Sequence, residues 1–254
     1  MAALRVHVEV DLSAGLHLRL PPGAARHVQV LRLQPGTALT LFNGLGGEWA
    51  AEVTHMGRSE VHVVTHGWSE VERELATRVT LAVCMPANER FDWLIEKATE
   101  LGAAAIQPLT SERSVLRVAG DRAEKKRAHW QGIAAAAAEQ CGRNRLPVVH
   151  PVHDLATWLR SAPPSPGCAA HVLSLRPGPC LAAALGAADA AQRDWLVLSG
   201  PEGGLSEREE DLAAECGYTP LSLGPRVLRA ETAPLALLAA LASLPPAAAP
   251  LQAR

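Results

Sequence analysis

Hydrophobic and polar residues alternate along the first part of the chain, as far as about residue 70. Val6, Val8 and Val10 are each followed by a polar residue, and this period of two is typical of a half-buried strand. Asn43-Gly44 is a strong signal for a hairpin turn, and several short strands in so little chain favour a small barrel. The pattern predicts strands at Leu4–Val10, Leu16–Leu20, Ala38–Phe42, Glu48–Val53 and Val61–Thr65, with a helix at about Gly23–Leu31.

A charged stretch, Ser69–Thr77, interrupts this alternation, and we place a domain boundary there, between residues 1–72 and 73–254. Beyond it, short apolar runs alternate with helical patterns, which predicts an α/β domain with a parallel sheet. The last helix is almost entirely alanine and leucine, so we expect it to pack within the domain and against a second subunit. The predicted strands are Val79–Cys84, Ala103–Pro108, Val148–Val152, His171–Leu175, Trp195–Leu198 and Thr219–Leu223, and the predicted helices are Phe91–Leu101, Asp121–Cys141, Glu207–Glu215 and Glu231–Leu244.

A glycine-rich turn follows the apolar run that begins at Trp195, and its sequence is Gly200-Pro201-Glu202-Gly203-Gly204. Ser206 stands three residues before Glu209, a spacing that predicts a capping box at the start of a helix. A strand, a glycine turn and a capped helix place backbone N–H groups around a cavity at the carboxyl end of a sheet, where ligands commonly bind. The turn lacks the dinucleotide and ATP phosphate-loop patterns, and a purely structural turn is the alternative.

Composition further limits the class of protein to which this chain can belong. No apolar run reaches the ~18 residues of a membrane span, so we expect no membrane association. The five cysteines are scattered without a C-x-x-C pair, which suits a reducing cytoplasm and provides no zinc framework. Two histidine pairs, His62 with His66 and His150 with His153, fall in or beside strands, where such spacings do not converge, so we expect no metal. A net charge of −2 means that RNA would have to bind a local basic surface.

Four segments, taken in order, identify a family. They are Phe91–Gly102 with Gln107–Val115, Glu139–Pro147, Leu198–Ser206 and Leu223–Ala233. Together they resemble the bacterial small-subunit (16S) rRNA uracil-N3 methyltransferases of the SPOUT, or α/β-knot, superfamily. The first 72 residues resemble the PUA-like RNA-binding barrel of that family. Two departures are Ala230, where the family usually has threonine, and Ala87, near which a lysine is usual.

The resemblance implies a deep trefoil knot at roughly residues 171–244, which would be a rare exception among folds. It also implies a cytoplasmic homodimer, formed through the knot, that acts in ribosome biogenesis on 16S rRNA or the small ribosomal subunit. S-adenosylmethionine would lie in the knot, with its adenine read by backbone groups and walled by leucines. The implied cofactor-binding residues are Leu175, Leu198, Ser199, Gly200, Pro201, Glu202, Gly203, Gly204, Leu223, Gly224, Val227, Leu228, Ala230 and Thr232.

Methylation of uracil at N3 requires loss of the N3 proton, and the resulting anion favours a fixed cation nearby. Arg229 is our candidate for that cation, and Glu231 either orients Arg229 or accepts the proton. A surface ion pair at a helix start is the alternative for these two residues. Glu202 either bonds the knot backbone or meets the cofactor's sulfonium.

Arginines in loops suit contacts with phosphates and base edges, so they are the candidates for binding RNA. With only six tryptophans, two phenylalanines and one tyrosine, extensive base stacking is not expected. The predicted RNA-binding residues are Arg26, Arg32, Arg113, Arg117, Arg143, Asn144 and Arg145.

Two other functions are compatible with these residues. A non-catalytic RNA-binding assembly factor on the same fold would bind RNA but no cofactor. A phosphate-handling hydrolase would use the glycine turn at a helix N-terminus and would need metal-binding carboxylates beside it.

Overall fold

The computed structural model describes residues 4–186 and 194–244. The chain divides into two compact units, Met1–Glu74 with Ala135–Leu146, and Leu75–Ala134 with Pro147–Arg254. The contacts thus assign residues 135–146 to the first unit, although this segment falls in the second predicted domain. The domain limits 1–72 and 73–254 stay a prediction.

The first unit is built on a five-stranded sheet in the order β1-β3-β4-β5-β2. β1 runs parallel to β3, and the other neighbouring strands are antiparallel. Ala25 and Val28 of the helix α1 are buried together with the inward residues of the strands, which explains the alternating pattern. The elements are β1 (Leu4–His7), β2 (His17–Arg19), α1 (Pro22–Val30), β3 (Ala38–Phe42), β4 (Glu48–Met56) and β5 (Val61–Ser69).

The strands β4 and β5 extend further than predicted, to Met56 and Ser69. Their register runs from Met56↔Val61 to Glu48↔Ser69, with irregularities on the way. Backbone hydrogen bonds sustain this pairing where the side chains are exposed, so hydropathy alone did not reveal it.

The second unit contains a seven-stranded sheet in the order β12-β10-β11-β6-β7-β8, with β9 paired to β7, and all of its pairs are parallel. A parallel sheet of this kind confirms the predicted α/β class. The strands are β6 (Val79–Cys84), β7 (Ala105–Thr110), β8 (Val148–Val149), β9 (His153–Asp154), β10 (Ala169–Leu173), β11 (Trp195–Ser199) and β12 (Thr219–Leu221).

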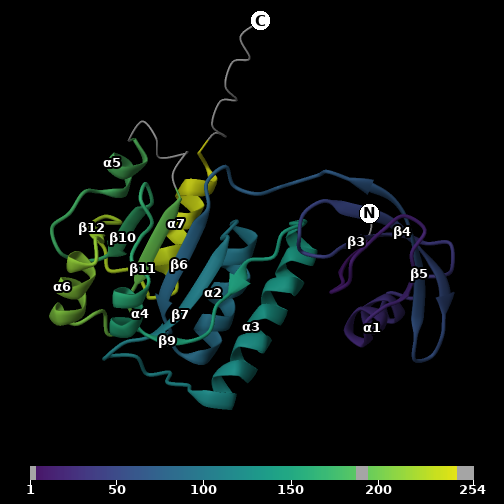
Figure 1. Cartoon of the computed structure of the whole chain (residues 1–254), viewed down its shortest axis with the longest axis horizontal. Helices are drawn as coiled ribbons and strands as arrows, with labels where there is room; N and C mark the ends of the chain where they lie inside the picture. The colour runs from purple at the N-terminus through teal and green to yellow at the C-terminus, as the bar shows by residue number, and fades with distance from the viewer. Residues whose placement is uncertain (1–3, 187–193, 245–254) are drawn as a thin grey trace, which may run out of the picture. The chain divides into compact units, whose positions relative to one another are not determined.

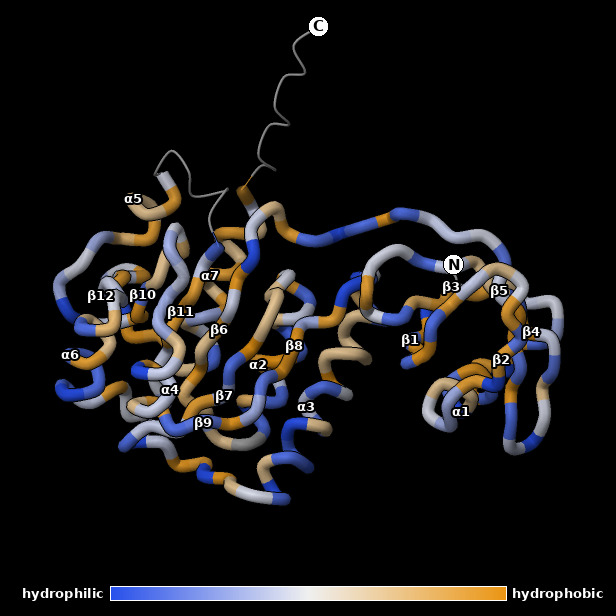
Figure 2. The backbone as a smooth tube through the Cα atoms, in the orientation of Figure 1, coloured by the Kyte–Doolittle hydropathy of each residue, from blue (hydrophilic) through white to orange (hydrophobic). Residues whose placement is uncertain are grey.

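Helices cover both faces of this sheet (Figure 1). Residues of α2, α3 and α7 pack in one core, and residues of α4 and α6 pack in the other. In β6, Leu81 belongs to the first core and Ala82 to the second, so both faces of the strand are buried and it reads as a continuous apolar run (Figure 2). The helices are α2 (Asn88–Glu100), α3 (Gly120–Cys141), α4 (Leu155–Ser161), α5 (Leu181–Leu185), α6 (Glu207–Glu215) and α7 (Thr232–Ala242).

The helix α7 is apolar all round but is buried along one side only. Leu235, Leu237, Leu238 and Leu241 are buried against the sheet and α2, whereas Thr232 and three alanines are exposed. The face left open consists of Ala236, Ala239 and Ala242, and its packing against a second subunit stays a prediction.

Of the predicted strand at Val148–Val152, only Val148–Val149 forms a strand, β8, and a second short strand, β9, follows the predicted range at His153–Asp154. Pro151 lies between them and lacks the N–H that a continuous ladder would need, while its carbonyl accepts a hydrogen bond from the Gln107 side chain at 2.8 Å. Within residues 4–186 and 194–244, no helix is both long enough and apolar enough to cross a membrane.

Candidate functional site

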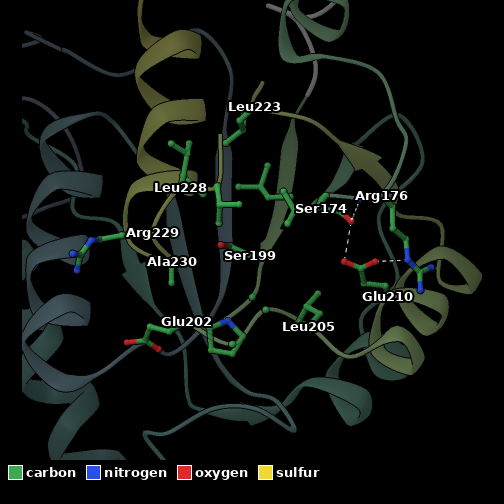
Figure 3. Close-up of a pocket in the computed structure, with 18 of the residues that line it drawn as sticks. Ser174, Arg176, Ser199, Glu202, Leu205, Glu210, Leu223, Leu228, Arg229 and Ala230 are labelled. Carbon is green, nitrogen blue, oxygen red and sulfur yellow. Dashed lines mark hydrogen bonds and ion pairs between the residues drawn. The ribbon is translucent and has the colours of Figure 1, made fainter. Parts of the chain in front are cut away.

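The carboxyl ends of β10, β11 and β12 lie at one edge of the parallel sheet. Leu173 of β10 is in register with Ser199 of β11 on one side and with Leu221 of β12 on the other. The loops that leave these strands therefore begin at the same level, which is where ligands bind in open α/β sheets. They enclose a cavity of about 860 Å³ (Figure 3).

The glycine turn after β11 has the predicted geometry. The Gly204 amide donates to the Pro201 carbonyl at 2.8 Å, and Gly204 has a φ of 68°, in the left-handed region that favours glycine. A Cβ on Gly200 would lie 2.9 Å from the Leu205 nitrogen, so the turn closes tightly on itself. The capping box is confirmed, because the Ser206 hydroxyl accepts from the Glu209 amide and the Glu209 carboxylate accepts from the Ser206 amide.

Glu202 reaches from the turn to the start of α2. Its Oε1 accepts a hydrogen bond from the Ala87 amide at 3.0 Å and lies 3.5 Å from Arg90 Nη1. The same arginine lies 3.9 Å, through Nε, from Oε1 of Glu231. Glu231 is 8% exposed, and its other carboxylate oxygen is buried without a hydrogen-bond partner. Arg90 thus stands between two carboxylates that come from different loops.

Arg229 differs in its surroundings from Arg90, Arg113 and Arg176, each of which contacts a carboxylate or a backbone carbonyl of the chain. It is exposed and forms no ion pair with another described residue, and Figure 3 shows its side chain directed away from Ser199 and Leu228. The described structure contains no Arg229–Glu231 ion pair, because Glu231 faces Arg90 instead. The Arg229 guanidinium is therefore available to a partner from outside the chain.

The opposite edge of the cavity is polar and fully paired within the chain (Figure 3). The Ser174 hydroxyl donates to Glu210 at 2.8 Å, and the Arg176 guanidinium pairs with Glu210 and with Asp211. These side chains close one end of the cavity.

The structure brings twelve of the fourteen predicted cofactor-binding residues into the cavity lining. Leu198 is fully buried in the core beside α4 and α6, because successive side chains of a strand point to opposite faces of the sheet and that of Leu198 points to the face these helices cover. Thr232 is exposed in the first turn of α7 and does not line the cavity. The lining residues are Leu175, Ser199, Gly200, Pro201, Glu202, Gly203, Gly204, Leu223, Gly224, Val227, Leu228 and Ala230.

Sequence reasoning missed several lining residues. Ser174 and Arg176 directly follow β10, so the rule that selected the turn after β11 would have found them too. Arg90 gave no such signal, since it lies within an amphipathic helix. The other missed lining residues are Leu173, Leu205, Glu207, Glu210, Leu221, Arg226 and Ala233.

The structure buries two of the predicted RNA-binding residues in the first unit. Arg143 is 3% exposed and pairs with Glu74, and Asn144 is 0% exposed and donates to Glu48 at 3.2 Å. Glu48 also pairs with Arg5 at 2.6 Å. Arg143 and Asn144 are therefore internal hydrogen-bonding groups in this structure, with partners far away in the sequence.

The pKa of Glu48 reflects this network. Its partial burial alone would raise the pKa, but hydrogen bonds from Arg5, Asn144 and Arg73 outweigh that effect and lower the pKa below the usual value. The carboxylate is thus held ionised at neutral pH.

The remaining RNA candidates are exposed. Arg145 pairs with Glu72 at 3.2 Å, and Arg117 donates to the carbonyls of Ser111 and Glu112. Arg26 lies on α1 and Arg32 follows that helix. Arg113 is a lining residue of the cavity in the second unit. No group of three or more His, Cys, Asp or Glu side chains suited to a metal ion occurs among the described residues.

Two family models and several known proteins match this chain. A family model described as an RNA methyltransferase domain matches residues 73–242, and one described as an RNA methyltransferase PUA domain matches residues 20–65. The chain is 35% identical over 216 residues to "Ribosomal RNA small subunit methyltransferase E" of Bacillus subtilis (strain 168), with 84% of each chain covered. It is also 35% identical to the protein of that name from Synechocystis, with 85% of this chain and 69% of the relative covered.

A solved structure agrees with these relatives. The crystal structure of ribosomal RNA small subunit methyltransferase E from Neisseria gonorrhoeae bound to S-adenosyl methionine superposes with a TM-score of 0.87 at 34% identity. The match covers 94% of this chain and 97% of that one.

Fold, cavity and domain matches define an RNA methyltransferase with a PUA domain ahead of its methyltransferase domain. The chain belongs to the ribosomal RNA small subunit methyltransferase E family. The family resemblance drawn from the sequence is confirmed.

Because Arg143 is buried and paired, we expect it to contribute to the stability of the fold. Arg143→Ala should lower the free energy of unfolding by about 3 kcal/mol, because Glu74 would lose its buried partner. Arg145→Ala is the matched control in the same loop, and its exposed pair should change stability by less than about 1 kcal/mol. Urea unfolding followed by circular dichroism measures both. An Arg143→Ala protein as stable as the wild type would contradict the internal role.

Proposed function

We propose that this protein transfers the methyl group of S-adenosylmethionine to N3 of a uridine in small-subunit (16S) rRNA. One observation carries the proposal: a cavity lies at the carboxyl ends of β10, β11 and β12 in a chain that superposes closely on a relative bound to S-adenosyl methionine. The names of the curated relatives support ribosomal RNA of the small subunit as the substrate.

The residues of the cavity fit this cofactor. Leu223 and Leu228 offer apolar walls for an adenine ring, and the backbone of the Gly200–Gly204 turn offers hydrogen bonds to its edge. Glycine at these positions allows the main chain to approach a ligand closely. When bound, S-adenosylmethionine supplies an activated methyl group on a positively charged sulfur. The twelve lining residues predicted from the sequence are the proposed cofactor contacts.

Arg229 is the proposed catalytic residue. Arg229 lines the cavity, its side chain points outward, away from Ser199 and Leu228, and it has no ion-pair partner among the described residues, so it can meet a uracil presented from outside (Figure 3). A fixed cation there would stabilise the negative charge that develops on the uracil carbonyl oxygens when the N3 proton leaves. Glu231 is buried, faces Arg90 and does not line the cavity. We therefore assign it the role of positioning Arg90, and not a contact with the substrate.

The approach of RNA is proposed to use exposed arginines, since phosphate contacts fix the register of a nucleic acid. Arg26, Arg32, Arg117 and Arg145 are exposed and suit this role. Recognition would then depend on RNA shape and on one extruded base.

The assembly and location also stay proposals. We propose a homodimer through the alanine face of α7 and a trefoil knot at about residues 171–244. The sheet order is consistent with the knot, because β12, which follows β11 in the chain, pairs with β10 on the side away from β11. The cytoplasm is the proposed location, in keeping with five cysteines in free form.

Cofactor binding is the first test. Isothermal titration calorimetry should detect S-adenosylmethionine bound to the wild type, and Gly203→Trp should weaken binding by more than about 30-fold, or ~2 kcal/mol, because an indole at this position would collide with the Arg113 side chain and distort the cavity-lining turn. Gly67→Trp is the matched control, since Gly67 lies on β5 with open space around it. Equal binding by Gly203→Trp and wild type would place the cofactor elsewhere.

Catalysis is the second test. Arg229→Ala should lower kcat by about 100- to 1000-fold while cofactor affinity stays unchanged, because only the transition state carries the negative charge. Mass spectrometry of digested 16S rRNA should detect N3-methyluridine as the product. Arg208→Ala, an exposed arginine on α6 outside the cavity lining, should behave as the wild type. Turnover by Arg229→Ala at the wild-type rate would remove Arg229 from the catalytic role.

A further inference from the structure

Arg113 lies after β7, in a segment distant in sequence from the glycine turn, yet its guanidinium holds that turn. Arg113 Nη1 donates to the Gly203 carbonyl at 2.9 Å and to the Leu205 carbonyl at 3.2 Å. Both acceptors belong to the turn between β11 and α6. The contact therefore fixes the course of the main chain along one wall of the cavity.

A second link joins the same two segments. The Glu112 amide donates to Glu209 Oε1 at 2.8 Å, while Glu209 Oε2 accepts from the Ser206 amide at 2.8 Å. Glu209 is 5% exposed, so both hydrogen bonds are shielded from water. The carboxylate that caps α6 thus also ties the turn to the residue before Arg113.

The backbone around Arg113 is itself held firmly. The Ser111 amide donates to the Ser114 hydroxyl at 3.0 Å, and both serines are buried. Arg117 returns to the same segment and donates to the carbonyls of Ser111 and Glu112. Arg113 therefore projects from a fixed base.

The side chain of Arg113 also packs against the turn. A Cβ on Gly203 would lie 3.3 Å from Arg113 Cβ and 3.5 Å from its Cδ. Glycine at this position lets the arginine stem lie flat against the main chain, and Arg113 is one of the cavity-lining residues.

We propose that Arg113 is a positioning residue for the cofactor-binding turn, and not a contact for RNA. The inference rests on the proposed binding of S-adenosylmethionine in this cavity. With both carbonyls bound to one guanidinium, the turn is already ordered before the cofactor arrives, and binding does not have to supply that ordering. Both hydrogen bonds come from Nη1, whose N–H groups are fixed in the guanidinium plane, whereas a lysine keeps the charge but carries a freely rotating ammonium on a flexible stem.

The test separates the affinity for cofactor from the affinity for RNA. Arg113→Ala should raise the Kd and KM for S-adenosylmethionine by about 10-fold, which corresponds to the loss of charge-assisted hydrogen bonds, and should leave the KM for 16S rRNA unchanged. Arg113→Lys should recover only part of the cofactor affinity. Arg122→Ala, which removes one exposed positive charge from α3, is the control for charge alone and should match the wild type in both constants.

The outcomes are distinct. A higher KM for rRNA with an unchanged Kd for S-adenosylmethionine, or full recovery of function in Arg113→Lys, would overturn the proposal in favour of a direct RNA contact. Wild-type cofactor affinity in both Arg113 variants would overturn it as well. Thermal unfolding of each variant identifies a folding defect, in which case Arg113→Lys alone decides. Failure of the wild type to bind S-adenosylmethionine would instead refute the proposed function.

Discussion

The parallel register of β10, β11 and β12 is the constraint on which the site depends. Leu173 is aligned with both Ser199 and Leu221, so the loops that follow these strands leave the sheet at one level. Burial of the sheet on both faces favours that register, because the side chains of each face are packed closely against particular helix residues in one of two cores. The cavity is therefore a consequence of how the strands pair, and the loops need only small residues to leave it open.

Around this frame, the turn after β11 is held by contacts with other segments as well as by its own hydrogen bonds. Glu202 is bonded to the start of α2, Glu209 to the segment after β7, and Arg113 to two carbonyls of the turn. These contacts give a glycine-rich loop, with its large conformational freedom, one defined shape. The Arg229 guanidinium, by contrast, has no ion-pair partner among the described residues and faces outward, as a group that meets a substrate should.

Much of this could be predicted from the sequence, and the failures have physical reasons. The capping box, the glycine turn and most strands were predicted correctly because short-range spacing determines them. Arg143 and Asn144 were assigned to RNA because a loop sequence does not reveal that Glu48 and Glu74, far along the chain, surround it. Arg113 was assigned to RNA for the same reason, since its contact with Gly203 depends on the fold and not on the local sequence.

The most direct test of the account is a crystal structure of the protein grown with saturating S-adenosylmethionine. The account predicts that the adenine lies in the cavity between the turn at residues 199–205 and the loop at residues 222–230, beside Leu223 and Leu228. Cofactor density at another surface, or an empty cavity at saturating ligand, would contradict it.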